Sequence, residues 1–98
     1  MPVDKSLLVR WQSLEAADCL KALADFAKED RAYIPRNSMR STRWHVTADG
    51  KDFEFICTGS KFWDVRANAG GGGAVDLAIH LFGITFKQAT RILMERNL

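Results

Sequence analysis

Three short segments with alternating side-chain character, separated by two turn signals, constrain this chain more than any other feature. Residues 43–47, 52–58 and 61–66 each place aromatic or aliphatic side chains at every second position, which is the period of a half-buried strand. An Asp-Gly pair at 49–50 and a Gly-Ser pair at 59–60 separate them, and both pairs favour two-residue hairpin turns. The sequence therefore predicts a three-stranded antiparallel meander.

The segments that precede and follow this predicted sheet in the sequence both have the apolar spacing of helices. A sheet of three strands needs a helix on one face to be stable, so we expect an α+β fold in which helices pack on the meander. We also expect an N-terminal helical segment, 1–32, followed by a sheet-containing domain, 33–98. The expected helices are 6–14, a longer one capped by Ser13 and running to about Asp30, 74–82 ended by Gly83, and 86–97 capped by Thr85.

The size and composition restrict the class of protein. The 98 residues suffice for one small domain, and 47% hydrophobic with 27% charged residues is typical of a soluble globular chain. No apolar run approaches the length of a membrane span, and the first residues carry no signal-peptide pattern. We therefore expect a cytoplasmic protein with no membrane partner.

The residues that most often bind metals or catalyse reactions are few and scattered. Cys19, Cys57, His45 and His80 show no paired ligand spacing, so we expect no zinc and no cofactor. Asp76 lies four residues before His80, and we interpret the two as a hydrogen-bonded pair on a helix surface. Because no acid–base or nucleophilic set converges, we do not expect an enzyme.

Positive charge is concentrated in the middle of the chain. The net charge is only +2, but Arg36, Arg40 and Arg43 fall within eight residues that contain no acidic side chain. A polyanion would meet this part of the chain first. Arginines in a loop also suit ordinary solvation, so both interpretations stay open.

Four consecutive glycines, residues 70–73, precede the third predicted helix. We expect a turn there, because glycine is costly inside regular structure and useful where the backbone turns or approaches a ligand closely. A helix N-terminus after such a turn favours an anion, although the lysine of a Walker motif does not follow. A flexible loop and a phosphate-approach loop are both compatible with the pattern.

Together these segments resemble the zinc-binding domain at the N-terminus of bacterial DnaG-type DNA primases. That family has a Cys-Pro-x-His loop, a Ser-Phe-x-Val strand, an aromatic strand, Cys-x-x-Cys-Gly-x-Gly-Gly-Asp-Ala-Ile and Gly-Leu-Ser-Phe-x-x-Ala. The matching segments here are Ile34-Pro-Arg-Asn37, Arg43-Trp-His-Val46, Val65-Arg-Ala-Asn-Ala-Gly-Gly-Gly-Gly-Ala-Val75 and Gly83-Ile-Thr-Phe-Lys-Gln-Ala89. The similarity covers about residues 33–95.

The resemblance implies a relative without zinc. The four ligand positions of the family correspond to Ile34, Asn37, Val65 and Asn68, none of which is a good zinc ligand. An apolar and amide cluster is expected to replace the metal. Relatives of this kind occur in replication and mobilisation proteins of plasmids and other mobile elements.

The resemblance also implies binding of a single-stranded DNA template as a non-catalytic module. Arginine and lysine would contact phosphates, aromatic rings would stack on bases, and the glycine run would permit close backbone approach. The candidate binding residues are Arg36, Arg40, Arg43, Trp44, Lys61, Phe62, Trp63, Arg66, Gly71 and Gly72.

Two other functions remain open. The domain could be an adaptor whose acidic N-terminal part docks a primase, helicase or polymerase. A nucleotide site at the glycine turn ranks third. The feature that discriminates the first two is whether the basic residues share a face with an exposed aromatic ring.

Overall fold

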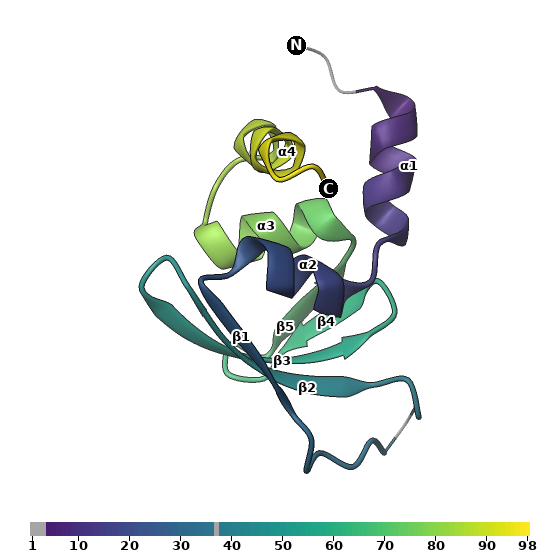
Figure 1. Cartoon of the computed structure of the whole chain (residues 1–98), viewed down its shortest axis with the longest axis vertical. Helices are drawn as coiled ribbons and strands as arrows, with labels where there is room; N and C mark the ends of the chain where they lie inside the picture. The colour runs from purple at the N-terminus through teal and green to yellow at the C-terminus, as the bar shows by residue number, and fades with distance from the viewer. Residues whose placement is uncertain (1–3, 37) are drawn as a thin grey trace.

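The computed structural model describes residues 4–36 and 38–98 as an antiparallel sheet with four helices (Figure 1). The helices are α1 (Lys5–Ser13), α2 (Ala16–Leu23), α3 (Ala74–Phe82) and α4 (Phe86–Glu95). The strands are β1 (Phe26–Asp30), β2 (Thr42–Ala48), β3 (Lys51–Thr58), β4 (Lys61–Asp64) and β5 (Ala69–Gly72). The expected α+β class, with an antiparallel sheet packed by helices, is confirmed.

The sheet has five strands, so the predicted count of three is wrong. Its order is β1-β2-β3-β4-β5, and every neighbouring pair is antiparallel. The three predicted strands form its centre as β2, β3 and β4. The predicted turns join them, and Asp49, Gly50 and Gly59 all adopt the positive φ angles that such tight turns need. The meander therefore continues by one strand on each side.

Strand β1 replaces the second half of a predicted helix. Helix α2 ends at Leu23, and Ala24 already has the extended angles φ −80° and ψ 155°. Glu15 rather than Ser13 occupies the N-cap position of α2. Residues 26–30 then pair with β2, which satisfies backbone hydrogen-bonding groups of both strands. The expected helix to Asp30 is thus wrong, and the N-terminal segment supplies a strand to the sheet.

Strand β5 replaces the predicted glycine turn. Residues 69–72 pair with β4, and the backbone turns only at Gly73, whose φ is 89°. Gly70 and Gly71 are needed for packing rather than for bending. A Cβ at Gly70 would lie 2.6 Å from the carbonyl oxygen of Phe62, and one at Gly71 would lie 3.0 Å from the Phe62 ring. Only glycine lets β5 lie this close to β4.

All four helices lie on one side of the sheet, as Figure 1 shows, with α4 stacked above α3. Helices α2 and α3 contribute Leu20, Leu77 and Leu81 to the same buried core as Phe55, which is fully buried. Burial of such side chains is the main stabilising contribution in a domain of this size. The other face of the sheet is left open by the helices.

The two C-terminal helices begin where predicted, and α3 also ends as predicted, whereas α4 ends at Glu95 rather than at Asn97. Gly83 caps α3 in the left-handed conformation, and Thr85 caps α4 in a reciprocal capping box with Gln88. On α4, Ala89 and Leu93 are buried, whereas Phe86 is exposed. Within the described part of the chain, no helix combines the length and apolar character needed to cross a bilayer.

Candidate nucleic-acid interface

The open face of the sheet gathers an exposed aromatic ring and basic side chains. Trp63 on β4 pairs with Ile56 on β3, and Ile56 pairs with Arg43 on β2, so these three residues form a row across the sheet. Lys61 lies two residues from Trp63 and projects from the same face, since side chains alternate along a strand. Arg43, Lys61 and Trp63 therefore share one face of the sheet.

Trp63 rests on the glycine strand beside it. Its side chain crosses toward Gly70, where an added Cβ would stand only 2.8 Å from the indole Cε3. Trp63 is still 43% exposed. One side of the ring is thus supported by backbone, while the remainder is available to a planar ligand.

Glu54 holds the basic side chains of this face together. Its carboxylate accepts a hydrogen bond from Arg43 Nη2, and Arg66 Nη2 lies 3.4 Å from Oε1. His45 Nδ1 is 3.8 Å from the same oxygen. The hydrogen bond from Arg43 is the main reason that the pKa of Glu54 lies below its usual value. Two guanidinium groups share one carboxylate, so this cluster keeps a net positive charge.

Two predicted arginines, Arg40 and Arg36, are not part of this cluster. Arg40 reaches over Gly59 in the β3–β4 turn and forms an ion pair of 3.6 Å with Glu15. Arg36 is exposed in the loop between β1 and β2. These two residues thus lie outside the row formed by Trp63, Ile56 and Arg43.

Trp44 and Phe62 are not available for base stacking, contrary to expectation. Both are 5% exposed and face the helices. Trp44 donates from Nε1 to Thr42 Oγ1 at 2.9 Å, with Lys21 Nζ 5.2 Å from the ring centroid. Phe62 packs edge-on against Phe55. The alternation of β2 and β4 puts both rings in the core, so Trp63 is the stacking candidate that remains accessible.

The glycines predicted to approach DNA are used within the fold. Gly71 lies against the Phe62 ring on the covered face. The amide of Gly72 donates to Asp76 Oδ2 at 3.3 Å, so a carboxylate already occupies the position a phosphate oxygen would need. The interpretation of Gly71 and Gly72 as a phosphate-approach loop therefore has no support from the geometry.

The former zinc-ligand positions do not form the expected cluster. Ile34 is 81% exposed, and Asn68 is an exposed turn residue with φ 55°. Strands β2 and β3 lie between the strand that precedes Ile34 and the strand that precedes Val65. Asn37 lies outside the described residues. Among residues 4–36 and 38–98, no group of three His, Cys, Asp or Glu side chains lies close enough to hold a metal ion.

Sequence reasoning missed a buried pair, Asp64 and His80. Asp64 is 3% exposed; its Oδ1 accepts from the amides of Arg66 and Ala67 at 3.0 Å, and its Oδ2 lies 2.6 Å from His80 Nε2. Phe62 and two other aromatic rings surround the imidazole. The alternation along β4 predicts that Asp64 and Phe62 lie on the same face of the sheet. Only the fold shows that His80 lies against Asp64 on that face. The pair ties α3 to the end of β4.

The two thiols are unsuited to nucleophilic chemistry. Burial raises the pKa of Cys19 to about 11 and that of Cys57 to about 12. A thiol in this range stays protonated at neutral pH and packs as a small apolar group.

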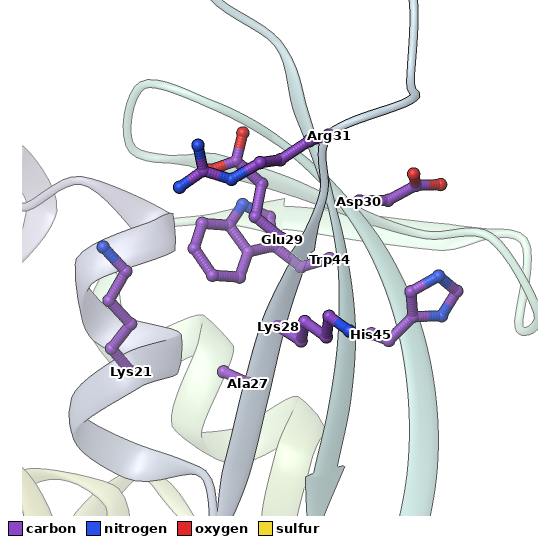
Figure 2. A pocket seen from close by; sticks show the side chains of 8 residues that line it. All are labelled: Lys21, Ala27, Lys28, Glu29, Asp30, Arg31, Trp44 and His45. Atoms are coloured by element: carbon purple, nitrogen blue, oxygen red, sulfur yellow. The ribbon is translucent and has the colours of Figure 1, made fainter.

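A second concave surface follows the free edge of the sheet, between α2 and β1. This groove has a volume of about 680 Å³. Figure 2 shows Lys21, Glu29 and Arg31 beside Trp44 on the side of α2, and Asp30 and His45 across the strand. Lys28 also lines it, so three cationic and two anionic side chains meet there.

The comparisons with known proteins add no relative to this description. No protein-family model, curated protein or solved structure matches the chain.

Proposed function

We propose that this protein is a non-catalytic module that binds single-stranded DNA on the open face of its sheet. The observation that carries the proposal is the exposed Trp63 ring, supported on Gly70 and on the same face of the sheet as Arg43 and Lys61. Single-strand binding sites combine aromatic rings, on which bases stack, with cationic groups that contact the phosphates. The open face contains both.

The charge on this face supports a polyanionic ligand. Arg43 and Arg66 already share the Glu54 carboxylate, which shows that the two guanidinium groups can converge on one anionic group. A phosphate has the same need for planar, charge-assisted hydrogen bonds. The resemblance of residues 33–95 to primase zinc-binding domains adds the proposal that the DNA is a template strand within a replication or mobilisation system.

Fluorescence anisotropy with a labelled oligonucleotide of about 12 nucleotides tests the proposal, in about 50 and 200 mM salt. Trp63→Ala should weaken binding by about 1–3 kcal/mol, or roughly 5- to 150-fold. Arg43→Gln should reduce the salt slope by about one phosphate contact. Phe86→Ala is the matched control, since Phe86 is an aromatic residue exposed to a similar degree on α4.

The outcomes separate DNA binding from the main alternative. Equal loss in Trp63→Ala and Phe86→Ala would contradict the assigned face. No binding to any single strand at high micromolar protein would reject the proposal and favour an adaptor that docks a primase, helicase or polymerase. Quenching of tryptophan fluorescence gives a second readout, because Trp11 and Trp44 are buried and Trp63 is exposed.

A further inference from the structure

A second exposed aromatic ring, Phe26, lies on the same face of the sheet as Trp63. On β1, Phe26 pairs with Thr47 on β2, and Thr47 pairs with Asp52 on β3. Thr47 is four residues from Arg43 on the same strand, so the alternation of side chains places this row on the open face. Phe26 is 54% exposed. The open face therefore carries exposed aromatic rings on β1 and on β4.

A hollow of about 240 Å³ lies beside Phe26. Its wall includes His45, Thr47, Asp52 and Arg66. Phe26, Thr47 and Asp52 form one row of the open face, and Figure 2 shows His45 projecting away from α2. Pockets for drug-sized ligands are usually about 300–1,000 Å³, so this hollow suits a smaller group, such as one planar ring.

The polar groups of the hollow suit a nucleobase better than a phosphate. Asp52 Oδ1 accepts a hydrogen bond from Thr47 Oγ1 at 2.8 Å. A carboxylate accepts at both oxygens, so Oδ2 remains an acceptor for a second donor. Its negative charge repels a phosphate, whereas the amino group of cytosine, adenine or guanine can donate to it. Thymine presents a carbonyl oxygen in place of this amino group and is the poorest match.

The Glu54 cluster lies between the hollow and Trp63. Arg66 lines the hollow, and its Nη2 lies 3.4 Å from Glu54 Oε1. Arg43 donates to the other oxygen of Glu54 and belongs to the row of Trp63. The side chain of Arg66 is 57% exposed, and exposed ion pairs are weak, so a phosphate can compete with Glu54 for this guanidinium group.

The separation of the two rings fits one strand of DNA. Phe26 and Trp63 are three strands apart in the sheet, and their rows are offset by the four residues from Arg43 to Thr47. With about 4.8 Å between strands and about 3.3 Å per residue, the rings lie roughly 20 Å apart. A stacked strand with about 3.4 Å per nucleotide covers this distance with about six nucleotides, and an extended strand needs fewer.

We propose that the hollow beside Phe26 is a second base-binding site for the same single strand, selective for bases that carry an amino group. The inference rests on the proposed function of the open face and adds a base preference to it. One base stacks on Trp63 and another enters the hollow against Phe26. Asp52 accepts a hydrogen bond from the second base, and the phosphates between the two bases pass the Glu54 cluster.

Anisotropy with labelled 12-nucleotide strands tests the second ring. Phe26→Ala should weaken binding roughly 5- to 150-fold, the usual effect of losing one stacked base. Phe26→Tyr should keep the wild-type affinity and Phe26→Leu should not, because only an aromatic ring stacks. Phe86→Ala is the matched control, since it removes an exposed ring on α4, and it should have no effect. An unchanged affinity in Phe26→Ala would overturn the inference.

The base preference tests the hollow itself. The wild-type protein should bind oligo-dC at least about fivefold more tightly than oligo-dT. Asp52→Ala should abolish this preference and leave the affinity for oligo-dT unchanged or higher, because a negative charge leaves the face. Asp30→Ala is the control, since Asp30 is a carboxylate in the row of Arg43, and it should keep the preference. A preference for oligo-dC that is missing in wild type, or that persists in Asp52→Ala, would overturn the assignment of the hollow.

A dinucleotide is too short to reach both rings, so it separates a local effect of Phe26 from a general one. Thymidine dinucleotide should quench the fluorescence of Trp63 equally in the wild-type protein and in Phe26→Ala. A loss as large as that of the 12-nucleotide strand would overturn the inference, because Phe26 would then act through the fold.

The failures of the two proposals are distinguishable. Binding that depends on Trp63 but not on Phe26 or Asp52 overturns the second site and leaves the open face as the binding surface. Absence of binding to any single strand by the wild-type protein overturns both.

Discussion

The two faces of the same sheet differ in how they satisfy their polar groups. The covered face carries Phe55, Phe62 and the buried carboxylate of Asp64, whose hydrogen-bond partners are all supplied by the protein. The open face carries Trp63 and the Glu54 cluster, where an aromatic ring and cationic side chains remain in contact with water.

This difference separates what holds the fold together from what is available for binding. A buried carboxylate with three hydrogen-bond donors contributes to stability and has little capacity left for a ligand. A half-exposed ring and shared guanidinium groups contribute less to stability, because water competes for them. Substitutions on the covered face should therefore affect unfolding, and those on the open face should affect binding.

The largest expected effect compares two adjacent residues of β3. Phe55→Ala removes a fully buried ring and should lower the free energy of unfolding by about 3–5 kcal/mol. Ile56→Ala, on the open face, should cost less than half as much. Urea unfolding of both variants gives the values. Equal losses would mean that the open face is as tightly packed as the covered one.

Replacement of Asp64, the carboxylate of the covered face, should have the second-largest effect on stability. Asp64→Ala leaves His80 and two backbone amides without their acceptor, and should lower stability by about 1.5–3 kcal/mol. Asp76→Ala is the control, since Asp76 is exposed in the first turn of α3 and should cost under about 1 kcal/mol. Thermal unfolding should rank the variants in this order, and a reversed order would show that Asp64 is not the structural carboxylate.

Substitution of two glycines of β5 tests whether the Trp63 side chain rests on this strand. A Cβ at Gly70 meets Phe62 backbone oxygen at 2.6 Å, whereas a Cβ at Gly72 has 3.8 Å to its nearest neighbour. Gly70→Ala should therefore cost about 1–3 kcal/mol and shift the fluorescence of Trp63. Gly72→Ala should be close to neutral or slightly stabilising. Similar stability of the two variants would contradict the close approach of β5 to β4.

The smallest expected effect is the pH dependence of the stability that Glu54 contributes. Its pKa is lowered in the folded state, so its contribution to stability is present above the ordinary value of 4.5 and is lost as the pH falls through the folded-state pKa. The difference in urea midpoint between wild type and Glu54→Gln should therefore shrink as the pH falls below 4.5. A constant difference down to pH 3 would contradict the Arg43–Glu54 contact.

The sequence predicts the centre of the fold well and its two edges poorly. The alternation in β2, β3 and β4 correctly separates Trp44 and Phe62 from Arg43 and Trp63, although it does not say which face the helices cover. At the first edge, Ala27 extends the apolar spacing of α2, and only the pairing of β1 with β2 decides against a helix.

Strand β5, at the second edge of the sheet, and the pair of Asp64 and His80 could not be predicted for other reasons. Residues 70–72 have no side chains, so a period of two is invisible in them and a strand cannot be told from a turn. The partner of His80 depends on how α3 lies on β4. Sequence spacing offers Asp76, which is four residues away on the same helix, whereas the fold supplies Asp64.

The strand order has a consequence for how the protein folds. Each strand pairs with its neighbour in the chain, so the sheet can grow outward from the Asp49-Gly50 hairpin without closing a long loop. Chains with such local contacts fold quickly. Helices α1 and α2 instead contact α3, which comes much later in the sequence. Because α2 also contacts β1, β2 and β3, we expect the meander and α2 to form first and the apolar surface of α1 to stay uncovered until α3 docks.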